Sequence, residues 1–376
     1  MRLARRQRAG FGDLRSHRAD WLFGRATRTA IAGGLAILLA TIVLAQAAGS
    51  STPYPPLFLI PALRQPQATP GSGPAIGFYG SQRFYLAWTG AATNKVFYSA
   101  LGNNCKHFSL VPCWMRQANV NGSWGKALAS DSPALVDYSG AMYAFWPGLA
   151  TKKVFYSAYN GTSWAPEATV NGSWGTAATE WPVALAVYNG DLYAAWVPWG
   201  ASSTISYSYF NGSSWSSSAA VPSLPSKRLG SPALVVYDGD LYLFWVAQGA
   251  ATGYSTYNGS VWSSPASVGG DWGKAVAITG LGLAVCDDDL FAAWVNGPSS
   301  AAQNIRYSDF DGSTWTKPVV VGGTKAVLGT PVLGASGETL YLAWAKYLFD
   351  KQGNEEGTRA LVTYAENVGL PPATVK

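Results

Sequence analysis

Three copies of one short motif carry the residues whose types suit ligand binding. The chain reads VNGSWGKA at 120–127, VNGSWGTA at 170–177 and VGGDWGKA at 268–275. Glycine beside a tryptophan leaves the indole face uncovered because glycine has no side chain. Such a face stacks on the apolar side of a pyranose ring, while amide and ammonium groups hydrogen-bond its hydroxyls. The candidate binding residues are Trp124, Trp174, Trp272, Asn121, Asn171, Lys126 and Lys274.

The same tryptophans have a second interpretation as packing wedges between structural repeats. Periodic aromatic residues are common in repeated β-sheet units. Two later connections lack the tryptophan and keep a basic residue, Lys227 and Lys325, near the equivalent point. The sequence leaves packing and ligand binding open. If the motif binds a ligand, its repetition predicts several weak sites that act together through avidity.

A second set of tryptophans defines the elements that must position these motifs. The phrase apolar–Tyr/Phe–x–Ala/Phe–Trp recurs at intervals of 58, 50, 49, 49 and 50 residues. Its tryptophans are Trp88, Trp146, Trp196, Trp245, Trp294 and Trp344. In the third repeat, Asn-Gly pairs at 189–190 and 211–212 separate runs of apolar residues, which is a strong hairpin signal. Each repeat therefore predicts two hairpins, or four short strands.

Tandem four-stranded units of this length are typical of β-propeller blades. Residues 364–375 align with residues 159–170, so the sixth unit is complete one residue before position 376. We therefore predict an all-β fold, a six-bladed β-propeller of four-stranded antiparallel blades over residues 73–375. An N-terminal hydrophobic helix is expected to precede it.

The first 72 residues divide into three segments. Residues 1–29 are basic, residues 30–48 are uncharged and apolar, and residues 49–72 form a linker rich in Pro, Ser and Gly. The apolar stretch fits a cleaved signal peptide, because Ala45-Gln46-Ala47 resembles a cleavage site, and also an uncleaved type II anchor. Both alternatives place the propeller outside the cytoplasm, either anchored to the membrane or secreted.

Composition argues against a nucleic-acid partner. The chain has a net charge of +6, and residues 1–28 alone hold eight arginines and two aspartates, so the propeller itself is neutral. Only 12% of the residues are charged, about half of the usual 25%, and 14% are aromatic. Cys105 and Cys113 both lie in the insertion that lengthens the first interval, and an exported protein would favour a disulfide between them.

No pattern of catalytic or metal-binding residues stands out. The chain has two histidines, and its acidic residues fall mainly at turns. The run Asp287-Asp288-Asp289 could serve a calcium ion, but it aligns with the turns Asn189-Gly190-Asp191 and Asp238-Gly239-Asp240. We therefore expect a turn there, and no cofactor, metal or enzymatic activity.

Four segments resemble the Asp-box of sialidases, S-x-D-x-G-x-T-W. They are Ser157–Trp164, Ser208–Trp215, Ser255–Trp262 and Ser308–Trp315. The aspartate position holds an aromatic residue in all four: Tyr159, Phe210, Tyr257 and Phe310. The resemblance implies propeller structure rather than hydrolysis.

Over residues 73–375 the chain resembles the propeller lectins, particularly the six-bladed fucose-binding kind with pockets between blades. The resemblance rests on blade number, repeat length and tryptophans between blades, and it implies glycan partners without naming a sugar. We expect a non-catalytic, multivalent, carbohydrate-binding propeller. The alternatives are a protein-interaction or cell-envelope scaffold and, third, a degenerate sialidase-like glycosidase.

Overall fold

The computed structural model describes residues 67–68, 72–80, 83–102, 113–296, 303–322, 324, 327–337, 339–349 and 355–366. All of them belong to one compact unit, Pro53–Lys376. The predicted basic segment 1–29 and hydrophobic helix 30–48 lie outside the described residues, as does most of the linker 49–72. Among the described residues, no helix has the length and hydropathy needed to span a bilayer.

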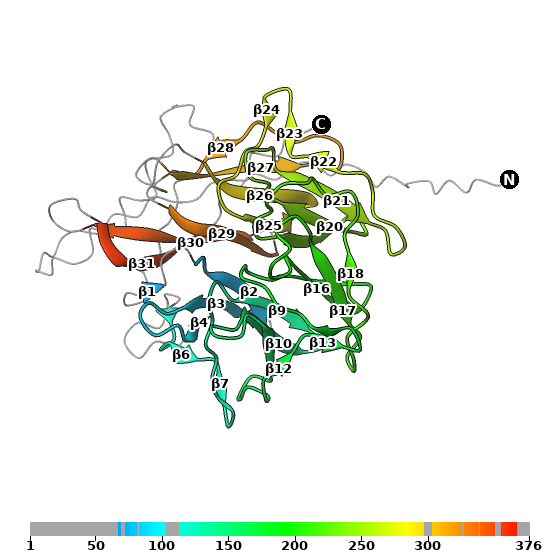
Figure 1. The fold of residues 1–376 in the computed structure, drawn as a ribbon. Helices are drawn as coiled ribbons and strands as arrows, with labels where there is room; N and C mark the ends of the chain where they lie inside the picture. Colours follow the sequence, from blue (N-terminus) through cyan, green and yellow to red (C-terminus); the bar gives the residue numbers. More distant parts are fainter. Residues whose placement is uncertain are drawn as a thin grey trace, which may run out of the picture. The chain divides into compact units, whose positions relative to one another are not determined.

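The described fold is an all-β propeller of small antiparallel sheets (Figure 1). Three four-stranded sheets follow each other in the middle of the chain. The first contains β9 (Ala134–Tyr138), β10 (Ala141–Pro147), β11 (Val154–Tyr159) and β12 (Ala168–Thr169). The second contains β15 (Ala184–Tyr188), β16 (Asp191–Trp196), β17 (Ser206–Phe210) and β18 (Ala219–Ala220). The third contains β19 (Ala233–Tyr237), β20 (Asp240–Trp245), β21 (Gly253–Tyr257) and β22 (Ala266–Ser267).

Two further four-stranded sheets complete the C-terminal part. One contains β25 (Leu281–Cys286), β26 (Asp289–Asn296), β27 (Asn304–Phe310) and β28 (Val319–Val320). The other contains β29 (Val327–Ser336), β30 (Thr339–Phe349), β31 (Glu355–Glu366) and β1 (Gln67–Ala68). Here β1 pairs antiparallel with β31, so residues from the two ends of the propeller share one sheet.

The remaining large sheet has five strands and corrects the prediction. It contains β2 (Ala75–Tyr79), β3 (Arg83–Thr89), β4 (Val96–Gly102), β5 (Cys113–Trp114) and β6 (Ala118–Asn119). Both β5 and β6 pair with β4, because the insertion in this repeat divides the outer strand into two pieces. The described residues therefore form five four-stranded blades, and the prediction of six four-stranded blades is wrong in this number.

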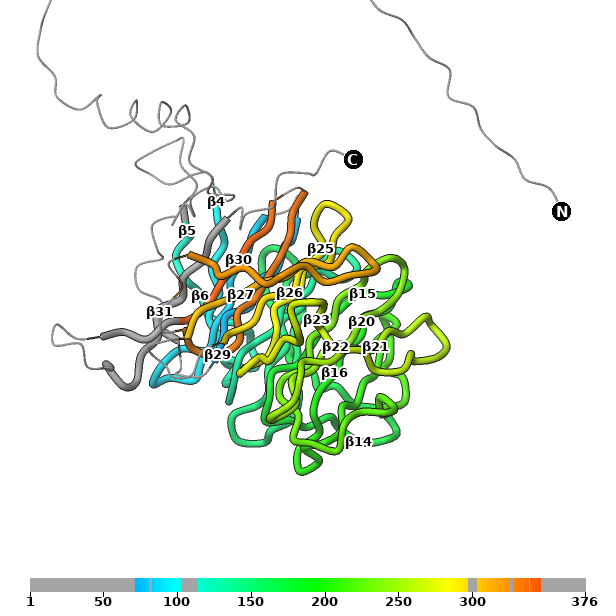
Figure 2. Tube along the Cα trace, turned by 90° about the horizontal axis from the view of Figure 1, so that it is seen from above, coloured from blue at the N-terminus to red at the C-terminus, as the bar shows by residue number. Residues whose placement is uncertain are grey.

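One edge strand of each large sheet lies at the centre of the propeller, and we call it the inner strand. Along the chain, β2, β9, β15, β19, β25 and β29 each contact the next, and β29 contacts β2. Figures 1 and 2 show the consequence, since the orange C-terminal strands lie beside the blue N-terminal ones. Neighbouring inner strands thus form a closed cycle.

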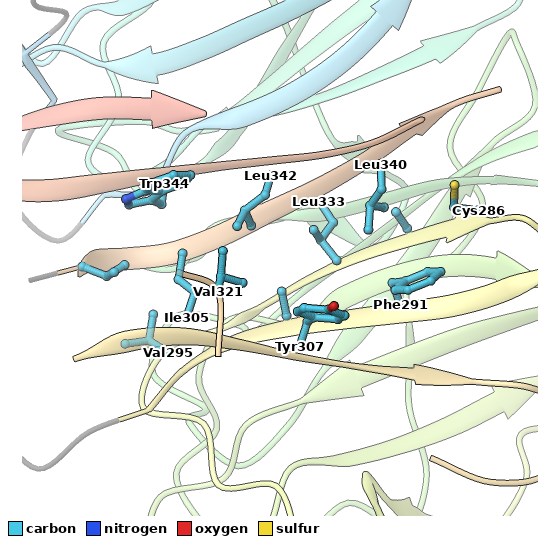
Figure 3. Close-up of a cluster of buried hydrophobic side chains, with 13 residues drawn as sticks. Cys286, Phe291, Val295, Ile305, Tyr307, Val321, Leu333, Leu340, Leu342 and Trp344 are labelled. Carbon is cyan, nitrogen blue, oxygen red and sulfur yellow. The ribbon is translucent and has the colours of Figure 1, made fainter. Parts of the chain in front are cut away.

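The sheets hold together through apolar side chains that meet between them. The six repeated tryptophans are at most 2% exposed. Figure 3 shows one such cluster, in which Phe291 and Cys286 of one sheet lie near Leu340 of the next, and Trp344 lies at the other end of the cluster. Burying a side chain of this size contributes roughly 1.5–3 kcal/mol. Cys286 is 2% exposed and occupies the position held by Tyr138 and Tyr237 in sister repeats.

The turns between the first two strands explain the aspartate run at 287–289. Asn189 and Gly190 have φ of +51° and +86°, and Asp238 and Gly239 have +47° and +80°. Asp287 and Asp288 adopt the same geometry, at +52° and +65°. Positive φ at both central residues defines a type I′ hairpin turn, which Asp tolerates better than most residues. The run therefore has the geometry of a hairpin turn.

The Asp-box-like segments form a second kind of hairpin. In each, one side chain at the turn caps two backbone N–H groups, and three of the four capping residues are asparagines. The fourth is Asp311, whose Oδ1 accepts hydrogen bonds from the backbone nitrogens of Ser313 and Thr314, both at 2.8 Å. These bonds, led by that from Thr314, lower the pKa of Asp311 to about 2.

Substitutions at Asp311 test this capping role. Asp311→Asn should change the free energy of unfolding by less than about 0.5 kcal/mol, because asparagine makes the same bonds in the sister turns. Asp311→Ala should cost roughly 1 kcal/mol through the lost hydrogen bonds. Urea unfolding at neutral pH measures both, and equal effects would contradict the capping role.

The acid titration gives an independent check. Because folding depresses the pKa of Asp311, its stabilising effect is fully present above the unfolded value of about 3.9 and is lost as pH falls through about 2. NMR titration of this carboxyl should show that depressed value, and Asp311→Asn should remove this part of the acid sensitivity.

Candidate functional site

The three repeated motifs form three small hairpins at the junctions between sheets. Their strands are β7 (Asn121–Gly122) with β8 (Gly125–Lys126), β13 (Asn171–Gly172) with β14 (Gly175–Thr176), and β23 (Gly269–Gly270) with β24 (Gly273–Lys274). Each has a two-residue loop that ends in the tryptophan. We call them the junction hairpins.

The two glycines of the motif have separate physical roles. The glycine after the tryptophan has φ of +109°, +106° and +102° in the three copies, at Gly125, Gly175 and Gly273, a range that disfavours other residues. The glycine before the turn is needed for space. A Cβ at Gly122 or Gly172 would overlap the Nε1 edge of the indole two residues later. The motif therefore encodes a hairpin that lays its indole flat against its own backbone.

Each junction indole also packs on the following sheet. Trp124 stacks on Trp146 of β10, with ring centroids 6.1 Å apart and 15° between the planes. Trp174 stacks on Trp196 of β16 at 5.9 Å and 20°. Trp272 packs against the cluster that contains Trp294 of β26. Aromatic pairs of this kind contribute about 0.5–1.5 kcal/mol beyond the area they bury.

The indole N–H groups complete the attachment to the next sheet. Trp124 Nε1 donates to the carbonyl oxygen of Ala165 at 2.8 Å, and Trp174 Nε1 donates to that of Ser216 at 2.8 Å. Trp272 Nε1 donates to the carbonyl oxygen of Trp315 at 3.1 Å. Because the N–H is occupied, a ligand can use only the ring surface of these tryptophans.

Two of these acceptors also accept a hydroxyl from an Asp-box-like segment. The carbonyl of Ala165 also accepts the hydroxyl of Ser157 at 2.7 Å, and that of Ser216 accepts the hydroxyl of Ser208 at 2.8 Å. The serine of the Asp-box-like segment and the junction tryptophan of the preceding hairpin therefore meet at one oxygen. The sequence contains both motifs, but their meeting depends on the positions of neighbouring sheets.

Solvent still reaches part of each junction indole. Trp124, Trp174 and Trp272 are partly buried, whereas the blade tryptophans beneath them are almost fully covered. Since one ring face stacks on the blade and the nitrogen edge is bonded, the accessible part lies away from the stacked face. These three residues serve the packing of the sheets and keep a reachable surface at the same time.

The polar candidates lie on the strands of the junction hairpins. Asn121 is paired with Lys126 across the first hairpin, and both side chains are exposed. Asn171 faces Thr176 in the second, and Lys274 faces Gly269 in the third. Only the first hairpin therefore combines the tryptophan, the asparagine and the lysine. Lys325 and Cys105 lie outside the described residues, so the predicted disulfide to Cys113 stays a prediction.

No family model and no curated protein matches the sequence. The structure, in contrast, resembles solved β-propellers. AofleA from Arthrobotrys oligospora gives a TM-score of 0.54 at 10% identity, over 82% of this chain and 92% of that one. The fucose-specific lectin from Aleuria aurantia gives 0.52 at 13% identity, over 81% and 99% of the two chains.

A sialidase is equally similar in fold. Trypanosoma rangeli sialidase in complex with the inhibitor DANA gives a TM-score of 0.54 at 9% identity, over 79% of this chain and 55% of that one. At such identities the likeness shows the propeller fold alone. It does not distinguish a binding protein from an enzyme.

Glycine substitutions test the geometry of the junction hairpins. Gly122→Ala should lower the free energy of unfolding by about 1–3 kcal/mol, because the new Cβ displaces the Trp124 indole from its stack. Gly322→Ala is the matched control, since a Cβ there meets nothing within 4 Å and should cost less than about 0.5 kcal/mol. Chemical denaturation of both variants decides the point, and equal stabilities would contradict the packed geometry.

Proposed function

We propose that this protein is a non-catalytic, multivalent, carbohydrate-binding propeller. The observation that carries the proposal is the repeated junction hairpin, which presents a partly exposed indole at three places between sheets. The lectin from Aleuria aurantia is fucose-specific by name and shares the fold, which adds support without fixing the sugar.

The chemistry of the hairpin suits a neutral, hydroxylated ligand. The accessible indole surface has no free donor, so it offers an apolar platform, as the C–H face of a pyranose requires. In the first hairpin the exposed amide of Asn121 and ammonium of Lys126 lie on the same hairpin as this platform and can bind ring hydroxyls. A small platform with two polar groups predicts weak binding at each site.

Repetition compensates for weak individual sites. The junction hairpins lie at three different junctions of one propeller. A branched or surface-attached glycan can therefore bind to more than one hairpin. Intramolecular binding of the second site raises the overall affinity without new contacts. We expect strong binding to dense glycan surfaces and weak binding to free monosaccharides.

A catalytic role has less support in the described residues. The described arginines Arg83, Arg116, Arg228, Arg306 and Arg359 lie on five different strands or connections. Glycoside hydrolysis needs two carboxyl groups that flank one bond, and the junction hairpins carry only Asp271. Fluorogenic sialosides and glycosides should therefore show no turnover, and turnover abolished by a single Asp or Glu substitution would favour the degenerate glycosidase.

The proposed site of action is outside the cytoplasm, with the propeller either anchored through residues 30–48 or secreted. The motivation is the arginine-rich segment followed by an uncharged stretch of 19 residues. N-terminal sequencing of the mature protein with membrane fractionation tests this. An intact N-terminus in a soluble cytoplasmic fraction would contradict both the anchored and the secreted alternative.

Binding of the full-length chain to a printed glycan array tests the proposed function. Wild type should bind at high glycan density, and the double substitution Asn121→Ala with Lys126→Ala should reduce binding about tenfold, because two polar contacts are lost. These side chains are exposed, so the fold should be unaffected. Lys153→Ala, an exposed lysine outside the first junction hairpin, is the matched control.

The rival scaffold function predicts a different result. If a correctly folded protein binds no glycan on the array, the carbohydrate proposal is wrong and a protein-interaction role becomes the better one. Trp124→Ala, Trp174→Ala and Trp272→Ala separate the two roles of the indole. If the variants that fold still bind glycan and the others fail to fold, these residues act in packing alone.

A further inference from the structure

The residues that precede the inner strands surround one end of the propeller axis. Five repeats have a proline near the start of the inner strand, and the sixth has Leu281 at the equivalent point. In five of the six repeats the residue before this position is small: Gly73, Ser132, Ser231, Gly280 and Thr330. These residues contact one another across repeats. Gly73 N donates to Ser132 Oγ at 2.7 Å, and Gly280 N donates to Thr330 Oγ1 at 3.0 Å. The remaining repeat places Trp181 at this position.

A cavity of about 140 Å³ lies where this symmetry is broken. We call it the axial cavity. It is bounded by residues at the start of five inner strands, and its lining combines apolar and polar side chains. The apolar ones are Trp181, Pro182, Val246 and Ile278. The polar ones include Asp131, Ser132, Ser231, Thr279 and Thr330.

Asp131 is held in place by three hydrogen bonds. Its Oδ1 accepts the backbone nitrogen of Ser132 at 2.6 Å, the Ser132 hydroxyl at 3.1 Å and the Ser72 hydroxyl at 3.2 Å. Within the described part of the chain, no residue donates to its second oxygen, Oδ2. Burial raises the pKa of Asp131 above its ordinary value. It is the one charged residue among those that line the axial cavity.

Trp181 is fixed from two directions. Its backbone nitrogen donates to the hydroxyl of the buried Thr179 at 3.0 Å. The guanidinium of Arg228 lies over its ring, 5.8 Å from the centroid. A cation over an indole is attracted by the ring face and restricts the ring. The aromatic wall of the axial cavity is therefore preorganised.

We propose that the axial cavity is a second binding site, which takes a single neutral sugar ring with Asp131 as the acceptor for its hydroxyls and Trp181 as its apolar wall. A pyranose has one apolar face and a rim of hydroxyls, and the lining offers apolar and polar side chains for both. The volume fits a single small ring and is well below the range of about 300–1,000 Å³ typical of larger ligands. This site is independent of the junction hairpins.

Saturation-transfer NMR on the full-length chain tests the axial site. The probes are methyl α-L-fucopyranoside, methyl α-D-mannopyranoside, methyl β-D-galactopyranoside and methyl β-D-glucopyranoside. Trp181→Ala and Asp131→Asn should each weaken binding of the preferred glycoside at least tenfold. Trp199→Ala, whose tryptophan is 63% exposed and outside the cavity, and Asp137→Asn are matched controls that should bind like wild type.

The outcomes separate this site from the proposed function. If substitution of Trp124, Trp174 and Trp272 leaves a binding event that Trp181→Ala abolishes, the axial site is supported even if the junction sites are wrong. If Trp181→Ala and Asp131→Asn bind like wild type, or if none of the four glycosides binds to wild type at millimolar concentration, the axial site is overturned.

A measurement without a substitution in the axial cavity covers the case in which these variants do not fold. The chain is labelled with 5-fluorotryptophan, and the Trp181 resonance is assigned with Trp181→Phe. The bound glycoside should shift the Trp181 fluorine signal and leave that of Trp199 unchanged. A titration that moves only the signals of other tryptophans would overturn the proposal.

Discussion

The contact between neighbouring sheets is the constraint on which this structure depends. A blade of four short strands cannot bury both of its faces alone, so every blade relies on the next one. At three junctions a tryptophan from a connecting hairpin makes this contact. Trp124 shows the full arrangement, because it stacks on Trp146 and donates to the same carbonyl that accepts the hydroxyl of Ser157. The connection, the blade core and the outer hairpin are thereby joined at one point.

This constraint also shapes the proposed function. A residue that must pack against a sheet and also terminate an exposed hairpin keeps one surface for solvent, and repetition then multiplies that surface around the propeller. The axis offers a different kind of surface, because the starts of the inner strands lie near one another there and Trp181 stands where the other repeats carry a small residue. In the proposed function, the repeats would provide multivalency at the junctions, and the break in the repeat would provide a single site at the centre.

The sequence predicts the strands and turns well because both depend on local chemistry. The tryptophan period, the Asn-Gly turns and the alignment of the aspartates at 287–289 all reflect contacts within one repeat. The fifth strand of the first sheet was missed, since the insertion interrupts the period there. The shared carbonyl of Ala165 and the presence of Asp131 and Thr330 in one cavity lining were missed for another reason: they involve residues of different repeats, and no local pattern encodes them.

Hydroxyl-radical footprinting of the tryptophans in the unliganded protein tests the central claim most directly, that the junction indoles are packed on one side and reachable on the other. Trp199 should be oxidised fastest, Trp124, Trp174 and Trp272 at intermediate rates, and blade tryptophans such as Trp146 most slowly. Junction tryptophans as slow as Trp146 would show that no face is available to a ligand. Junction tryptophans as fast as Trp199 would show that they do not hold the sheets together.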